Sequence, residues 1–183
     1  MLRITAGKYK NRALKVAEDV TRPFTERMRI SVFDLLQEHI QGAHVADLYA
    51  GSGAVGIEAL SRGAFSATFV ESNHQALIYL KENFQTLKLG KEAEIIKADV
   101  NYFIKNISLK FDLIFLDPPF TIQKKGMYFD ITLLSKLLTP DGLVILRVEK
   151  EQYTKNRIIS IGLTEIYKKT YGRSNVIFYS ARM

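Results

Sequence analysis

The stretch Ala46-Asp47-Leu48-Tyr49-Ala50-Gly51-Ser52-Gly53-Ala54-Val55-Gly56 decides the fold of this 183-residue chain. Its apolar beginning is typical of a buried strand, its glycines of a tight turn, and its end of the first turn of a helix. A strand, a turn and a helix in this order form the first half of a βαβ unit, which joins parallel strands. We therefore expect an α/β protein built on a parallel sheet.

The same alternation continues toward the C-terminus. Apolar runs and helical periodicity predict strands 45–49, 67–71, 94–98, 112–117 and 142–148, and helices 54–61, 74–88, 100–106 and 127–138. Strand-like runs 163–170 and 175–181 flank the turn Tyr171-Gly172-Arg173-Ser174 and predict a hairpin. The pattern indicates a doubly wound, mostly parallel sheet that ends in an antiparallel pair.

The N-terminal segment has a different organisation. Strand-like runs 2–5 and 13–16 flank the basic turn Gly7-Lys8-Tyr9-Lys10-Asn11-Arg12 and predict a small hairpin. After Pro23, with Thr25 as N-cap, one amphipathic helix is expected from the spacing of Met28, Val32, Leu35, Leu36 and Ile40. We expect a single domain over residues 1–183, of which residues 1–24 are a basic hairpin extension.

The composition is that of a globular protein, with 47% hydrophobic and 25% charged residues. The chain has no cysteine, which excludes disulfides and thiolate metal sites. Its three histidines are scattered without metal-ligand spacing, so we predict no metal site. A signal peptide and a long apolar run are both absent, which predicts a soluble, cytoplasmic protein without a membrane partner.

The positive charge lies at the two ends of the chain. Of the net charge of +7, residues 1–31 carry +5 and residues 150–183 carry +5, whereas residues 32–149 carry −3. Two solvated basic ends are one interpretation. The alternative, which we favour, is a rim that contacts the phosphates of a nucleic acid around an acidic centre.

The glycine-rich turn satisfies G-x-G-x-x-G, and Glu71 follows Gly51 by twenty residues, as in dinucleotide-binding proteins. Asp47 argues against a pyrophosphate, because an anion beside the loop would repel it. S-adenosylmethionine is cationic and suits the site better. The predicted cofactor residues are Asp47, Ala50, Gly51, Ser52, Gly53, Glu71 for the ribose hydroxyls and Asp99 for the adenine amine. These acidic residues could instead cap the helices that follow the strands. A nicotinamide-dependent oxidoreductase also remains an alternative function, because the glycine spacing permits it.

A second strand end, Asp117-Pro118-Pro119-Phe120, is suited to chemistry on a planar amine. The prolines lack backbone donors and push the chain toward extended geometry, so carbonyl groups and the carboxylate of Asp117 can accept the two hydrogens of an NH2 group. Phe120 can stack on the base that carries this amine. Asp-Pro-Pro is also an ordinary way to end a strand, so a plain turn remains an alternative.

The chain resembles the RsmD-type family of ribosomal RNA methyltransferases over nearly its whole length. The resemblance rests on Arg3-Ile4-Thr5-Ala6-Gly7 with Asn11-Arg12, Thr21-Arg22-Pro23 through Arg27 and Arg29, Asp47 to Gly53, Glu58-Ala59-Leu60-Ser61-Arg62-Gly63-Ala64, Asp117-Pro118-Pro119-Phe120, and Tyr171-Gly172. The sequence departs from the family pattern at Phe24 and Ile30, where threonine and glutamate are usual.

This resemblance implies a Rossmann-like class I methyltransferase with a seven-stranded sheet, acting as a monomer. It implies S-adenosylmethionine-dependent methylation of the N2 amine of a guanine in small-subunit (16S) ribosomal RNA, within an assembling particle. The RNA phosphates are then expected on Arg3, Lys8, Lys10, Arg12, Arg22, Arg27 and Arg29. Tyr9 could stack on a base or pack within the hairpin. Adenine N6 or cytosine N4 methylation, and RNA binding without catalysis, remain alternatives.

Overall fold

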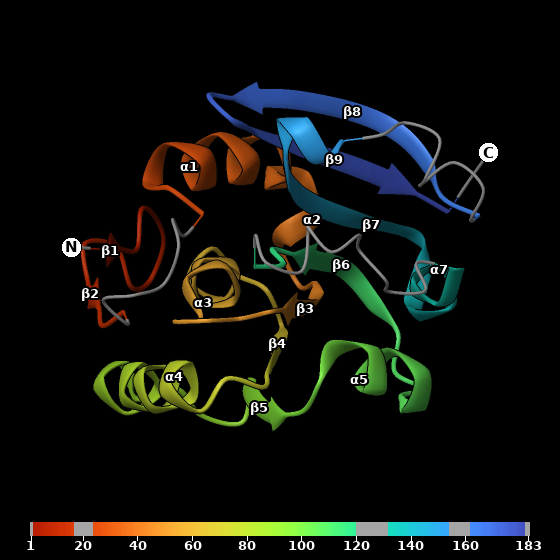
Figure 1. The fold of residues 1–183 in the computed structure, drawn as a ribbon. Helices are drawn as coiled ribbons and strands as arrows, with labels where there is room; N and C mark the ends of the chain where they lie inside the picture. Colours follow the sequence, from red (N-terminus) through yellow and green to blue (C-terminus); the bar gives the residue numbers. More distant parts are fainter. Residues whose placement is uncertain (1, 17–23, 120–131, 154–161, 182–183) are drawn as a thin grey trace.

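The computed structural model describes residues 2–16, 24–119, 132–153 and 162–181 (Figure 1). Its strands are β1 Leu2–Arg3, β2 Ala13–Leu14, β3 His44–Leu48, β4 Ser66–Glu71, β5 Ala93–Lys97, β6 Phe111–Leu116, β7 Leu138–Glu149, β8 Thr164–Tyr171 and β9 Ser174–Ser180. Its helices are α1 Glu26–Leu35, α2 Gln37–Ile40, α3 Ala54–Ser61, α4 His74–Leu87, α5 Val100–Asn106, α7 Thr132–Leu137 and the 3-10 turn η1 Lys150–Gln152.

The predicted sheet is confirmed. Seven strands pair in the order β5-β4-β3-β6-β7-β9-β8. The first five are parallel, whereas β9 runs antiparallel to both β7 and β8. The chain moves outward from β3 to β4 and β5, and then returns to place β6 on the other side of β3. The reversal between β3 and β6 is the topological switch point, where ligands bind in open α/β sheets.

Two apolar layers enclose the sheet. Val45 and Phe115 pack with α1 to α4 on one face, whereas Leu48 and Leu116 pack with α5 and α7 on the other. Neighbouring residues of β3 and β6 thus alternate between the two cores. Burial of both faces explains why these strands are continuous apolar runs in the sequence.

The prediction of one continuous amphipathic helix is wrong. The segment consists of two helices, because Leu36 has φ −94° and ψ 3° and ends α1. Met28, Val32 and Ile40 are buried as expected, but Leu35 is 45% exposed. Residues spaced by four place their side chains against the sheet, and Leu35 lies to the side of this row. The N-cap is confirmed, since Thr25 Oγ1 accepts the backbone N–H of Met28 at 3.3 Å.

The N-terminal hairpin packs against α3 and α4 (Figure 1). Its two strands contain only two residues each, shorter than predicted, with Leu2 opposite Leu14. Ile4 is fully buried and Leu14 is 3% exposed, so both side chains belong to the core beside α3. The hairpin therefore sits on the helix that follows the glycine-rich turn.

Candidate functional site

The predicted acidic strand ends meet at the switch point of the sheet. Leu48, the last residue of β3, is paired with Leu116, the last residue of β6. The backbone N–H of Asp117 donates to the carbonyl oxygen of Leu48 at 3.4 Å. This register brings the segment after β6 next to the glycine-rich loop after β3.

Asp47 is buried beneath the loop, at 2% exposure. Its Oδ2 accepts the backbone N–H of Gly56, in the first turn of α3, at 2.8 Å. Burial raises the pKa of Asp47 to about 7, and the negative charges of Asp117 and Glu71 act in the same direction. A cation bound above the loop would relieve this cost by favouring the ionised carboxylate.

The three glycines of the loop have different roles. A Cβ on Gly53 would lie 2.5 Å from Leu80 Cδ1, and one on Gly56 would lie 2.4 Å from the ring of Phe69. These two glycines allow α3 to pack closely on its neighbours. Gly51 has φ +56°, and a Cβ there would meet only the carbonyl oxygen of Tyr49, at 4.0 Å. The space beside Gly51 therefore fits the close approach of a ligand to the backbone.

Glu71 connects the loop to the end of β4. Its Oε2 accepts the N–H of Gly51 at 2.8 Å, and its Oε1 accepts the N–H groups of Ser72 at 2.8 Å and Asn73 at 2.7 Å. These bonds hold the carboxylate beside the loop, because each oxygen is anchored to the backbone. A carboxylate oxygen can accept more than one hydrogen bond, so ligand hydroxyls can still bind there.

Asp99 caps α5, as the capping alternative expected. Its Oδ1 accepts the N–H groups of Asn101 at 2.9 Å and Tyr102 at 3.1 Å. Burial raises the pKa of Tyr49, and the negative charges of Asp99 and Glu71 raise it further. Tyr49 also has φ +66°, in the left-handed region that non-glycine residues rarely adopt. Such strained residues concentrate at functional sites.

Asp117 forms an ion pair that the sequence pattern does not predict. Arg147 Nη1, from β7, lies 2.6 Å from Asp117 Oδ1, and the Arg147 side chain is 5% exposed. Burial raises the pKa of Asp117, whereas the charge and hydrogen bond of Arg147 oppose this rise. The signal in the sequence was a single arginine within the apolar run Leu143-Val144-Ile145-Leu146-Arg147-Val148. A charged residue at a buried strand position requires a partner.

The rest of the Asp-Pro-Pro-Phe motif is described in part. Pro118 is buried and Pro119 is exposed at the edge of the site. Phe120, predicted to stack on a base, lies outside the described residues, as does Arg22.

Most of the described cations predicted to contact RNA are on the surface: Arg3, Lys8, Lys10, Arg12 and Arg27. The prediction that Arg29 contacts RNA is wrong, because Arg29 is fully buried and cannot reach a phosphate. Its guanidinium donates to the carbonyl oxygens of Phe24 at 3.1 Å and Arg3 at 2.5 Å. Tyr9 is 8% exposed and belongs to the core, so it packs within the protein.

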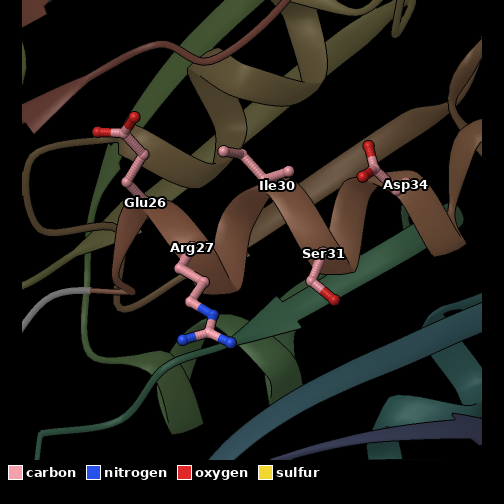
Figure 2. A pocket seen from close by; sticks show the side chains of 5 residues that line it. All are labelled: Glu26, Arg27, Ile30, Ser31 and Asp34. Atoms are coloured by element: carbon pink, nitrogen blue, oxygen red, sulfur yellow. The ribbon is translucent and has the colours of Figure 1, made fainter.

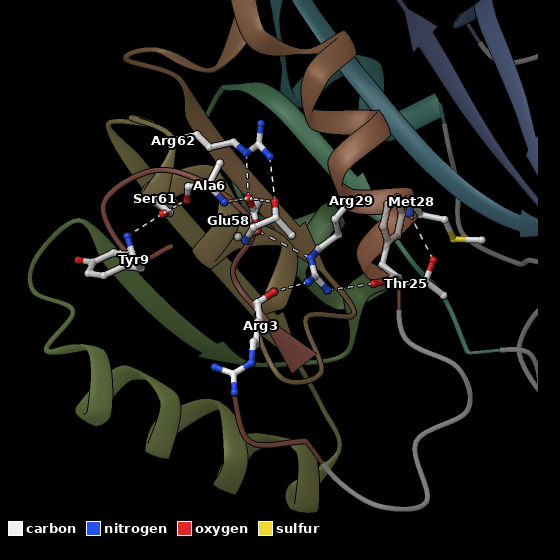
Figure 3. A network of polar contacts seen from close by, with 12 residues as sticks. Arg3, Ala6, Tyr9, Thr25, Met28, Arg29, Glu58, Ser61 and Arg62 are labelled. Carbon is white, nitrogen blue, oxygen red and sulfur yellow. Dashed lines mark hydrogen bonds and ion pairs between the residues drawn. The ribbon is translucent and has the colours of Figure 1, made fainter. Parts of the chain in front are cut away.

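Figure 3 shows the network that holds the hairpin on α3. Its centre is Glu58, which is fully buried and accepts the N–H of Thr5 at 2.8 Å and Arg62 Nε at 2.8 Å. Arg29 Nε lies 3.8 Å from the same carboxylate. Arg29 and Glu58 are thus structural partners that compensate each other's charge in the interior.

A groove of about 490 Å³ lies along α1 (Figure 2). It is lined by Glu26, Arg27, Ile30, Ser31 and Asp34. Its two acidic and one basic side chains offer no converging set of groups for one ligand. Among the described residues, no cluster of histidine and acidic side chains could hold a metal ion, and no helix is long and apolar enough to span a membrane.

The strand order and the glycine-rich loop define a Rossmann-like fold, and solved structures similar to it are those of methyltransferases. Residues 2–180 match the family described as conserved hypothetical protein 95. The chain belongs to this family, which is the RsmD family.

The chain is similar to ribosomal RNA methyltransferases over most of their length. The chain is 35% identical to ribosomal RNA small subunit methyltransferase D of Haemophilus influenzae, over 82% of this chain and 80% of that protein. It is 33% identical to the protein of the same name from Buchnera aphidicola, over 100% and 91%. The solved structure of Escherichia coli yhhF, to which methyltransferase activity is ascribed, has a TM-score of 0.85 at 30% identity and covers 99% of both chains.

Proposed function

We propose that this protein transfers a methyl group from S-adenosylmethionine to the N2 amine of a guanine in small-subunit ribosomal RNA. The observation that supports this most directly is the position of Asp117, beside the glycine-rich loop and at the start of Asp-Pro-Pro-Phe. A carboxylate at that point can accept an N–H of a planar amine within reach of a ligand on the loop. The names of the relatives support ribosomal RNA as the substrate.

The cofactor would be held by residues around the loop. Gly51 leaves space for its approach, Glu71 beside the loop would bind the ribose hydroxyls, and Asp99 after the next strand would accept an N–H of the adenine amine. When bound there, S-adenosylmethionine supplies an electrophilic methyl group. The carboxylates of Asp47 and Glu71 favour a cationic ligand at this position and disfavour a pyrophosphate.

The base amine would be oriented by the motif after β6. Its lone pair is delocalised into the ring, so the protein must turn this lone pair toward the donor. Asp117 accepts one N–H, and the carbonyl oxygen of Pro118 accepts the other. The ionised carboxylate also stabilises positive charge that develops on the nitrogen as the bond between the methyl group and sulfur breaks. The proton that the methylated amine then loses goes to Asp117 or to water. Arg147 holds Asp117 in this orientation through its 2.6 Å contact to Oδ1.

The test uses small ribosomal subunits that lack the modification. They are incubated with the protein and S-adenosylmethionine labelled in its methyl group, and the labelled nucleotide is mapped. Label on the N2 of one guanine is expected. Label on an adenine N6 or a cytosine N4 would show that the substrate is another base than guanine. Tight binding of NADH without binding of S-adenosylhomocysteine would overturn the proposal.

The matched variant is Asp117→Ala. Its activity should fall by orders of magnitude, while RNA and S-adenosylhomocysteine still bind, because the carboxylate acts mainly on the reacting amine. Unchanged activity would remove Asp117 from the mechanism. A comparison of free 16S RNA with assembling particles as substrate tests whether the protein acts during assembly, as we propose.

A further inference from the structure

Asn83, a buried residue of α4, connects two segments that the proposed function assigns to different ligands. It is 1% exposed. Its Nδ2 donates to the carbonyl oxygen of Ser52 at 2.9 Å and to that of Lys15 at 2.9 Å. Its Oδ1 accepts the backbone N–H of Lys15 at 2.8 Å.

These bonds use both hydrogens of the amide. Ser52 lies between Gly51 and Gly53 in the glycine-rich loop, and Lys15 directly follows β2 of the hairpin. A planar amide has fixed donor directions, so the two carbonyl groups are held in one arrangement relative to each other. Displacement of either segment would leave a polar atom of the buried Asn83 amide without its partner, which costs free energy.

The hairpin is also attached to the helix that follows the loop. Lys8 donates its backbone N–H to the carbonyl oxygen of Ser61 at 2.7 Å, and Tyr9 donates to Ser61 Oγ at 2.9 Å. The exposed cations Lys8, Lys10 and Arg12 are on this hairpin. The hairpin is therefore attached both to the glycine-rich loop, through Asn83, and to the helix that follows the loop.

We infer that Asn83 couples the binding of RNA at the hairpin to the binding of the cofactor at the glycine-rich loop. Each ligand favours the arrangement in which the Asn83 amide joins both segments, so each increases the affinity of the other. By linkage, the two increases are equal. Asn83 is a positioning residue in this scheme. The inference rests on the proposed function, which supplies the two ligands.

The experiment measures the dissociation constant of S-adenosylhomocysteine by calorimetry, without RNA and with saturating 16S RNA. In the wild-type protein, RNA should lower this constant by about fivefold or more, the lower end of typical couplings. In Asn83→Ala, the effect of RNA should fall to less than about twofold. In each protein, S-adenosylhomocysteine should change the affinity for RNA by the same factor by which RNA changes the affinity for S-adenosylhomocysteine.

Glu82→Ala is the matched control. Glu82 precedes Asn83 on α4 and contacts Lys15 only through a surface ion pair, with Lys15 Nζ 3.0 Å from Glu82 Oε2. This variant should retain the wild-type coupling. Asn83→Asp is a second test, because it keeps the acceptor for Lys15 N–H and loses both donors. Its coupling should also be lost.

A loss of stability alone does not change the ratio of two affinities measured on one folded variant. Wild-type protein that binds both ligands without coupling would overturn the inference and leave the proposed function standing, as would full coupling in Asn83→Ala. Failure of the wild-type protein to bind S-adenosylhomocysteine or RNA at all would overturn the proposed function itself, and the inference with it.

Discussion

At the scale of single residues, the chemistry of the site depends on how two carboxylates at the strand ends are compensated. Asp117 is paired with Arg147, whereas Asp47 has a backbone N–H from Gly56. Burial raises the pKa of both groups. The cation beside Asp117 favours the ionised form that can accept a hydrogen bond, so the two carboxylates respond differently to pH.

Replacement of Arg147 by leucine should move the acid limb of the pH profile of kcat/KM to higher pH. Arg147 lowers the pKa of Asp117, so its loss allows burial to raise that pKa further. An opposite charge at this distance favours the ionised carboxylate, so the acid limb should move to higher pH when that charge is removed. Arg147→Lys keeps the charge and should move the limb less. An acid limb at the same pH in wild type and Arg147→Leu would contradict this role.

Asp47 makes stability depend on pH. Its pKa rises from the ordinary 3.8 to about 7 on folding, so its contribution to stability is complete below pH 4 and is lost as pH rises to about 7. A pKa that differs by one between the folded and unfolded protein corresponds to about 1.4 kcal/mol of unfolding free energy. Asp47→Asn keeps an acceptor for Gly56 N–H and does not titrate.

The unfolding free energy of Asp47→Asn, relative to wild type, should therefore increase between pH 5 and pH 7.5 in ligand-free protein. Urea denaturation at the two pH values measures this difference. Parallel pH dependence in the two proteins would show that Asp47 does not titrate in this range.

At the scale of elements, the N-terminal hairpin is held by its backbone as much as by its side chains. Gly7 has φ +77°, and a Cβ there would lie 1.7 Å from the carbonyl oxygen of Ser61 on α3. Lys8 N–H donates to the same oxygen. The hairpin can approach α3 this closely only because position 7 has no side chain.

Gly7→Ala should destabilise the protein by about 1–3 kcal/mol more than Gly42→Ala, by urea denaturation. The two glycines are matched, because Gly42 has φ +76° and its Cβ would meet nothing within 4 Å. The strain of the left-handed backbone is common to both variants, so the difference isolates the clash with Ser61. Equal destabilisation would show that the hairpin can move away from α3 without cost.

At the scale of the whole molecule, the charge of +7 is unevenly distributed, and the described cations Lys8, Lys10 and Arg12 are together on the hairpin. An RNA that binds there releases counterions, which makes its affinity depend on salt. The carboxylates of Asp47, Glu71, Asp99 and Asp117 lie near the carboxyl ends of β3, β4, β5 and β6, so phosphates and the target base would bind in different regions.

Charge reversal at Lys8, Lys10 or Arg12 should weaken RNA binding and reduce the slope of log K against log salt by roughly 0.7–0.9 for each lost phosphate contact. Titrations at several salt concentrations measure this slope. Lys105→Glu makes the same change in charge on α5, outside the hairpin, and should leave the slope unchanged. Equal effects of the hairpin variants and Lys105→Glu would indicate a response to net charge alone.

The sequence by itself determined the βαβ order, the antiparallel end of the sheet and the residues at the strand ends. Periodicity and turn chemistry are local properties, and the acidic residues follow strands whose ends must meet at one edge. It also showed that Asp47 and Asp117 come at the ends of apolar strands.

Only the tertiary structure decided which charges are exposed and which are paired. Arg29 looked like a surface cation but is buried with Glu58, and Arg147 looked like part of a strand but reaches Asp117. The sequence also did not predict that α1 ends at Leu36, or that Asn83 donates hydrogen bonds to both Ser52 and Lys15. The reason is physical, since these roles depend on groups distant in the chain, and local sequence patterns carry no information about which distant groups fold against each other.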